Sequence, residues 1–136
     1  MRKVLAVIGV FCIFLIHPAV RASELTYLFM PAVRQDKPQS MLLMMHGYGA
    51  NEQDFNDFPV IVPGNMIVVS LRAPLPVAGD SYQWYRNSDK QTQVAADQQS
   101  SSDAVVSTVK TLQQQYHVSA SHTYLGGFSQ GAVMTY

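Results

Sequence analysis

Cysteine is nearly absent from this chain of 136 residues, since Cys12 is the only one. It lies inside an apolar N-terminal run, so residues 23–136 contain no thiol. A disulfide framework, a thiol nucleophile and a Cys-based metal site are therefore excluded for residues 23–136. The His, Asp and Glu residues show no spacing typical of a metal site, so we expect no bound metal.

Charged residues are scarce as well, at 13% of the chain, and they form no run or patch of one sign. The chain carries 9 basic and 9 acidic residues. Because Arg2, Lys3 and Arg21 lie in the N-terminal segment, residues 23–136 keep six basic against nine acidic residues, a net charge of −3. This composition lacks the basic surface that binds a phosphate backbone, so nucleic acid is not expected as a partner.

No apolar run is long enough to span a bilayer, which takes about 20 residues. The longest run, Val4–Ile16, has 13 residues. Arg2 and Lys3 precede it, and small residues at positions 20 and 22 provide a site for signal peptidase. This order predicts a signal peptide over residues 1–22, an exported protein (periplasmic or extracellular) and no stable membrane span after cleavage. An uncleaved N-terminal anchor is the alternative.

The rest of the chain contains many short apolar runs separated by turn signals. Four strands are predicted, of which the last three are apolar throughout: Glu24–Pro31, Met41–Met45, Met66–Leu71 and Tyr124–Phe128. Strands of this kind expect cover on both faces and a neighbouring strand on each side.

Two helices are predicted between these strands. Asn51 would cap a short helix that begins with residues 51–54, and Ser100-x-x-Asp103 resembles the capping box of a longer helix. The apolar residues of the longer helix fall on one face: Val105, Val109, Leu112 and Tyr116. Leu75–Asp97 is predicted to form a long connection that contains a cluster of aromatic residues: Tyr82, Trp84 and Tyr85. The alternation predicts one α/β domain over residues 23–136, a mostly parallel sheet with helices on both faces.

The stretch Gly127-Phe128-Ser129-Gln130-Gly131 matches the pattern G-x-S-x-G between an apolar strand and the start of a helix. This is the setting of a nucleophile elbow, in which a positive φ lifts the serine hydroxyl clear of the sheet. A Cβ at either glycine would collide with neighbouring backbone. The backbone N–H of Gln130 would face a developing oxyanion from the positive end of the helix. The alternative is a Gly-Ser turn before an ordinary helix.

A second motif, His46-Gly47-Tyr48-Gly49, directly follows the predicted strand Met41–Met45. Its two glycines, Gly47 and Gly49, allow the backbone to turn N–H groups toward the point where the elbow lies. Both motifs come at the carboxyl ends of predicted strands, which is where an open α/β sheet places its site.

Four pieces of the sequence resemble the phospholipase/carboxylesterase family of α/β-hydrolases, which includes the acyl-protein thioesterases. They occur in the family's order: Leu42–Ala50, Arg72-Ala73-Pro74, Trp84-Tyr85 and Gly126–Gly131. The resemblance covers roughly residues 27–136, the amino-terminal half or more of such a domain. It implies an α/β-hydrolase fold and a serine hydrolase of carboxylesterase, lysophospholipase or thioesterase type, with a small-molecule acyl ester as substrate and no cofactor.

The resemblance also assigns roles to individual residues. It makes Ser129 the nucleophile, and the backbone N–H groups of Tyr48 and Gln130 the oxyanion hole. It places Trp84 where the family lines its acyl pocket. The chain departs from the family at Arg86, where an acidic residue is common, so the acyl-chain preference is not carried over.

The catalytic triad of this fold runs Ser, Asp or Glu, then His along the chain. No His, Asp or Glu follows Ser129 in this sequence. Of the earlier histidines, His46 is expected to support the loop after it by hydrogen bonds, whereas His117 and His122 are expected on the surface. We therefore expect residues 23–136 to be the amino-terminal part of a hydrolase domain, truncated after the elbow and inactive alone. The alternatives are a non-catalytic binding protein with the first half of the fold, or a peptidase or lipase of the same fold.

Overall fold

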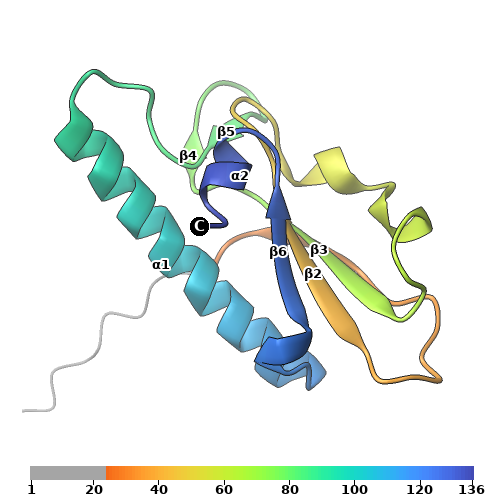
Figure 1. Cartoon of the computed structure of the whole chain (residues 1–136). Coiled ribbons are helices and arrows are strands. Elements are labelled where there is room, and N and C mark those ends of the chain that lie inside the picture. The colour runs from red at the N-terminus through yellow and green to blue at the C-terminus, as the bar shows by residue number, and fades with distance from the viewer. Residues whose placement is uncertain (1–23) are drawn as a thin grey trace, which may run out of the picture.

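A four-stranded sheet forms the centre of the computed structural model, which describes residues 24–136 (Figure 1). The strands lie in the order β1-β3-β2-β6. Their bounds are Tyr27–Met30 for β1, Ser40–Met45 for β2, Met66–Leu71 for β3 and Thr123–Gly127 for β6. All four predicted strands are present. The signal peptide predicted over residues 1–22 lies outside the described residues.

The sheet is mostly parallel, as predicted. Strand β2 runs parallel to both of its neighbours, β3 and β6, and only β1 is antiparallel to its neighbour β3. Strands β2, β3 and β6 therefore end at one edge of the sheet, here called the carboxyl edge. The residues that follow them there are His46, Arg72 and Phe128. Two further short strands, β4 (Leu75–Pro76) and β5 (Tyr82–Gln83), pair with each other beyond this edge.

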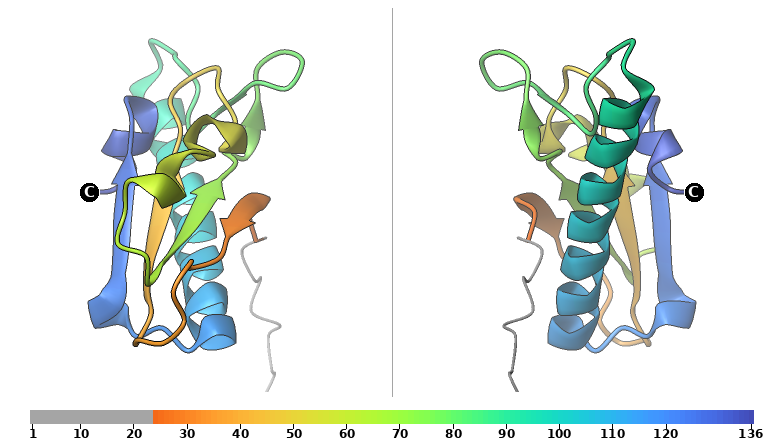
Figure 2. Two further views of the ribbon diagram at one scale, coloured as in Figure 1. Left: turned by 90° about the vertical axis from the view of Figure 1, so that its right-hand side faces the viewer. Right: turned by 90° about the vertical axis from the view of Figure 1, so that its left-hand side faces the viewer.

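Helices cover the two faces of the sheet unequally. Helix α1 (Gln91–Tyr116) crosses one face, and the 3₁₀ turns η1 (Glu52–Phe55) and η2 (Phe58–Val60) lie on the other (Figure 2). A third 3₁₀ turn, η3 (Ala120–His122), precedes β6, and the short helix α2 (Gln130–Val133) follows β6. No helix within residues 24–136 is long and apolar enough to cross a membrane.

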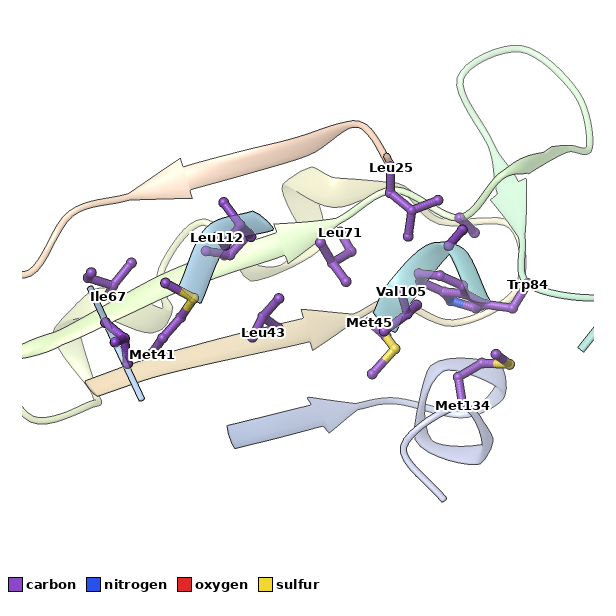
Figure 3. Packing of buried hydrophobic residues seen from close by; sticks show 14 of the residues in the cluster. Leu25, Met41, Leu43, Met45, Ile67, Leu71, Trp84, Val105, Leu112 and Met134 are labelled. Carbon is purple, nitrogen blue, oxygen red and sulfur yellow. The ribbon is translucent and has the colours of Figure 1, made fainter. Parts of the chain in front are cut away.

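Side chains of β2 and β3 alternate between two hydrophobic cores, one on each face of the sheet. The larger core lies under α1 and includes Met41, Leu43, Leu71, Val105 and Leu112 (Figure 3). The smaller core lies under η1 and is formed by Met44, Phe55 and Val68. This alternation explains why both strands are apolar at every position except Ser40 and Ser70. Each large side chain buried in this way contributes about 1.5–3 kcal/mol.

The structure corrects the predicted start of the long helix. Helix α1 begins at Gln91, so the polar stretch before Ser100 is helical and the predicted capping box does not form. This stretch is rich in Gln and Ala, which are good helix formers. Asp97 and Ser101 lie on its buried side, where both make hydrogen bonds to the preceding loop. The connection before the helix is correspondingly shorter than predicted, and it contains β4 and β5.

Strand β6 is an edge strand of the sheet, and within the described residues it lacks the cover on both faces that an apolar strand expects. Tyr124 is 49% exposed and Leu125 is 42% exposed. Successive side chains of a strand point to opposite faces, so neither face of β6 is fully covered. Within residues 24–136 its only neighbouring strand is β2.

Candidate active site

A sharp turn between β6 and α2 presents Ser129 at the carboxyl edge. Ser129 has φ 53° and ψ −118°, a conformation that residues with a Cβ rarely adopt. The residue is exposed, and its hydroxyl makes no hydrogen bond within residues 24–136. This is the backbone geometry that the G-x-S-x-G pattern predicts for a nucleophile elbow.

Gly127 and Gly131 stand where backbone segments touch. A Cβ on Gly131 would lie 2.5 Å from the carbonyl carbon of Met45 and 2.6 Å from the carbonyl oxygen of His46. A Cβ on Gly127 would lie 2.5 Å from the carbonyl oxygen of Gly131. Backbone atoms cannot move aside as the end of a side chain can, so only glycine fits at these two positions. The elbow is therefore pressed against the end of β2, which fixes Ser129 relative to the residues after that strand.

Residues 46–49, here called the oxyanion loop after the role proposed for it below, leave β2 beside the elbow. Gly47 faces Ser129 so closely that a Cβ on Gly47 would lie 3.4 Å from the Cβ of Ser129. The backbone N–H groups of Tyr48 and Gln130 donate to no acceptor within residues 24–136. Two unused N–H groups beside one exposed hydroxyl are the elements from which an oxyanion hole is made.

His46 holds the oxyanion loop from inside the protein. Its buried ring accepts a hydrogen bond from the N–H of Ala73 at Nε2 (3.0 Å), and its Nδ1 lies 2.7 Å from the carbonyl oxygen of Gly47. Because Nε2 accepts, Nδ1 carries the proton and donates. The acceptor belongs to the peptide unit that also carries the Tyr48 N–H, so this bond orients that N–H. Burial lowers the pKa of His46, which keeps the ring neutral. His46 thus supports the loop, as predicted.

Trp84 lies beneath the oxyanion loop. Its ring is completely buried in the larger core (Figure 3). Its indole N–H donates to the carbonyl oxygen of His46 at 2.8 Å. A buried ring offers no surface to a pocket within the described residues, so the expected place in an acyl pocket gains no support from this position. The structure shows Trp84 instead as a support of the loop.

An ion pair that the sequence did not reveal also supports the oxyanion loop. The guanidinium of Arg72 donates two hydrogen bonds of 2.6 Å to the carboxylate of Glu52, and one of 3.0 Å to the hydroxyl of Tyr82. Tyr82 in turn pairs with the backbone of Gly49 and Ala50. The Arg72 guanidinium lowers the pKa of Glu52, and the Glu52 carboxylate raises the pKa of Arg72. Both groups are therefore charged at neutral pH.

Arg86, where the family commonly has an acidic residue, pairs with Asp97 on α1. Its guanidinium donates to the carboxylate at 2.7 and 2.8 Å, and its backbone N–H adds a third hydrogen bond of 3.0 Å. Arg86 lowers the pKa of the Asp97 carboxyl, and Asp97 raises the pKa of Arg86. The pair fixes the segment after Trp84 to the long helix.

Neither a base nor a metal cluster stands beside Ser129 within residues 24–136. Both ring nitrogens of His46 are engaged in hydrogen bonds. His117 follows α1 and His122 precedes β6, so both lie at the opposite end of the sheet. The whole of β6, which rises about 3.3 Å per residue, therefore separates these two histidines from the elbow. The described residues contain no group of three or more His, Cys, Asp or Glu that could hold a metal ion.

A mostly parallel sheet, a serine at positive φ between strand and helix, and a Gly-rich loop after the neighbouring strand define an α/β-hydrolase. The sequence places the chain more narrowly. Residues 31–136 match the model of the phospholipase/carboxylesterase family, so the chain belongs to that family. The resemblance drawn from the four motifs is thereby confirmed. Comparison with curated proteins gives no match.

Solved structures with a similar fold include several esterases. Esterase PE8 superposes with a TM-score of 0.69 at 24% identity, over 82% of this chain and 55% of that one. The Bacillus cereus carboxylesterase gives 0.65 at 21% identity, over 81% and 50%. The carboxylesterase from Mesorhizobium loti gives 0.64 at 19% identity, over 83% and 56%. The chain thus shares their fold and spans about half of their length.

Proposed function

We propose that this chain carries the nucleophile and the oxyanion hole of a serine hydrolase that cleaves acyl esters. The observation that supports this most directly is Ser129, an exposed hydroxyl held at φ 53°. Beside it are the N–H groups of Tyr48 and Gln130, which have no other acceptor within the described residues. Membership in the phospholipase/carboxylesterase family supports the same reaction class.

In the proposed reaction, the Oγ of Ser129 attacks the acyl carbonyl carbon while its proton passes to a base. The π electrons of the carbonyl move onto its oxygen, which the two N–H groups stabilise by about 3 kcal/mol each. Collapse of this intermediate expels the alcohol or thiol, which takes up the proton from the base, and leaves Ser129 acylated. Water then attacks the acyl group in the same way and releases the acid.

The base for these steps is not among the described residues. In this fold it is a histidine paired with Asp or Glu, and both follow the nucleophile along the chain. We therefore propose that the activity belongs to a protein that contains this chain together with those residues. Residues 23–136 by themselves are expected to turn over no ester above background.

The strain at Ser129 favours an enzyme over a protein that only binds. A non-glycine residue in such a conformation costs about 1–3 kcal/mol. A binding protein with the same fold could carry glycine there and avoid this cost.

A fluorophosphonate probe tests this proposal in the full-length protein. The probe should label one serine, and Ser129→Ala should abolish both labelling and hydrolysis of a short-chain aryl ester. Ser121→Ala is the matched control, because Ser121 is exposed at the opposite end of the sheet. Labelling that survives Ser129→Ala would mean that another residue is the nucleophile.

We also propose that the protein is exported. The support is the order of charged, apolar and small residues in residues 1–22. Mass spectrometry of the protein from its native compartment should find an N-terminus at Ser23. Recovery from the cytoplasm with residues 1–22 intact would contradict export.

A further inference from the structure

The side chain of Gln130 is buried and fully paired, although it opens a short helix at the edge of the molecule. It is 6% exposed. Its Oε1 accepts from the backbone N–H of Trp84 at 3.0 Å, and its Nε2 donates to the carbonyl oxygen of Tyr85 at 2.9 Å and lies 3.4 Å from Oδ1 of Asn87. A buried amide is costly unless both of its ends are paired. The segment from Trp84 to Asn87 is therefore held in one position relative to the elbow.

Trp84 extends this connection to the oxyanion loop. Its indole N–H donates to the carbonyl oxygen of His46, and its own carbonyl oxygen accepts a 2.6 Å hydrogen bond from Ser101 on α1. The His46 carbonyl belongs to the peptide unit directly before the one that carries the Tyr48 N–H. A continuous series of buried hydrogen bonds thus joins Gln130 to the loop through the core.

We infer that the side chain of Gln130 is a positioning residue that, through Trp84, sets the separation between the backbone N–H groups of Gln130 and Tyr48. The inference rests on the proposed function of these two groups as an oxyanion hole. Each donor stabilises a developing oxyanion only if it stays at hydrogen-bond distance from it. The two donors come from separate segments of the chain, so a link between those segments keeps both within reach of one oxygen.

Gln130→Met in the full-length protein tests this role, because Met fills a similar volume and pairs with nothing. We expect kcat for an aryl ester to fall about 10- to 100-fold, less than or comparable to the loss of a donor outright. KM should change little, since the link acts on the transition state. The affinity for a trifluoromethyl ketone, which adds to the serine and leaves an oxyanion in the hole, should fall by the same factor as kcat. A loss of stability alone would not produce this proportionality.

Gln130→Glu provides a second measurement that does not depend on the first variant folding. Ionised Glu keeps an acceptor for the Trp84 N–H but turns a negative charge toward the Tyr85 carbonyl oxygen. Protonated Glu regains a donor at that place. The activity of this variant relative to wild type should therefore rise as the pH is lowered toward 5.

Gln113→Met is the matched control. It removes one amide hydrogen bond, to Oγ1 of Thr123 at 2.9 Å, at the opposite end of the sheet, and kcat should stay unchanged. Wild-type protein without Ser129-dependent turnover would overturn the proposed function, and the positioning role with it. Turnover in the wild type, with kcat and inhibitor affinity in Gln130→Met within twofold of it, would overturn the positioning role alone. A relative activity of Gln130→Glu that does not change with pH would do the same. An equal loss in Gln113→Met would also overturn it.

Discussion

Two residues other than glycine have a positive φ within residues 24–136, and they lie at opposite ends of the sheet. His117, directly after α1, has φ 55° and ψ 36°, whereas Ser129, directly after β6, has φ 53° and ψ −118°. The conformation of His117 is left-handed helical and ends the helix. Its N–H and that of Val118 both bond to the carbonyl oxygen of Gln113, which is a common way to satisfy the last turn of a helix.

The conformation of Ser129 has a different cause. No capping hydrogen bond of its own N–H or hydroxyl accompanies it within the described residues. The feature that accompanies it is instead the close contact of Gly131 with the end of β2. The positive φ of His117 thus belongs to the local structure that ends a helix. The positive φ of Ser129 goes with tertiary packing. Strain that the surroundings hold in place is typical of functional sites.

Polar residues differ between the two ends in the same way. At the carboxyl edge the polar side chains of His46, Glu52 and Gln130 are buried, and each is paired. At the opposite end His122 is exposed, and its Nδ1 lies near the hydroxyl of Ser119. The protein has desolvated polar groups where they hold loops in position, although this costs more than leaving them in water. Four predictions test how far this difference goes.

The largest effect is expected from Gly131→Ala. The new Cβ would meet the backbone of Met45 and His46, which cannot move without displacing the end of β2. We expect a loss of about 3 kcal/mol or more in the free energy of unfolding, beyond ordinary overpacking. Urea unfolding followed by the fluorescence of Trp84, the only tryptophan, measures it.

Gly64→Ala is the control for this substitution. A Cβ on Gly64 would meet only the flexible side chain of Arg34, at 3.1 Å from its Cδ. We expect a change within about 1 kcal/mol, because this side chain can move aside. Similar losses at the two glycines would contradict the view that the elbow is pressed against backbone.

The next effect concerns two ion pairs. In the pair at the carboxyl edge the side chains of Arg72 and Glu52 are 27% and 10% exposed, and in the other pair those of Arg34 and Asp36 are 57% and 62% exposed. Arg72→Met leaves a carboxylate partly buried without its partner and should cost about 2–3 kcal/mol. Arg34→Met should cost less than about 0.5 kcal/mol, since exposed pairs contribute little. Equal losses in the free energy of unfolding, measured with urea, would contradict the difference drawn between the two ion pairs.

The pH dependence of the free energy of unfolding should show the contribution of His46. Its pKa is lowered in the folded state because burial disfavours the charged ring, so between the folded and unfolded pKa values the unfolded chain binds more protons. The stabilising contribution is therefore present above the unfolded pKa of about 6.5 and is lost as the pH falls through the folded pKa. We expect a slope of up to about 1.4 kcal/mol per pH unit below pH 6.5.

His46→Gln should remove this slope, whereas His122→Gln, at the exposed end, should keep it. Carboxyl groups do not obscure the start of this slope. Because the pKa values of Glu52 and Asp97 are lowered, their loss of stability begins only near the unfolded carboxyl pKa of about 4, below that of His46. A slope that persists in His46→Gln would have to come from another group.

How much could be predicted depends on whether the signal is local in sequence. The strands and the elbow could be predicted because apolar runs and the spacing of Gly127 and Gly131 report directly on burial and close contact. The support by His46 could be predicted because the residue adjoins the loop that it holds. The ion pair of Arg72 with Glu52 could not, because only the fold brings these residues together.

The first turns of α1 could not be predicted for a related reason. Residues 91–99 carry no apolar stripe, and the anchor of this stretch is the contact of Asp97 with Arg86, which no local pattern indicates. The burial of the Trp84 ring under the oxyanion loop, and its hydrogen bond to His46, have no local signal either. Local patterns thus predict the backbone of the candidate site, whereas the tertiary hydrogen bonds that hold it in place have no local signal.

The smallest effect is expected at the two non-glycine residues with positive φ, Ser129 and His117. Glycine at either position removes the steric cost of a Cβ there, about 1–3 kcal/mol, and increases the freedom of the unfolded chain, which offsets about 0.4–1 kcal/mol. We therefore expect Ser129→Gly to stabilise the protein by about 1 kcal/mol and His117→Gly by about 0.5 kcal/mol, since the left-handed helical region is the less strained of the two. Ser129→Gly should abolish fluorophosphonate labelling, and His117→Gly should preserve it. Ser129→Ala is the decisive control, because it removes the hydroxyl and keeps the Cβ. If Ser129→Ala were as stable as Ser129→Gly in urea, the strain would not lie in the backbone, and the contrast between the two ends of the sheet would reduce to exposure alone.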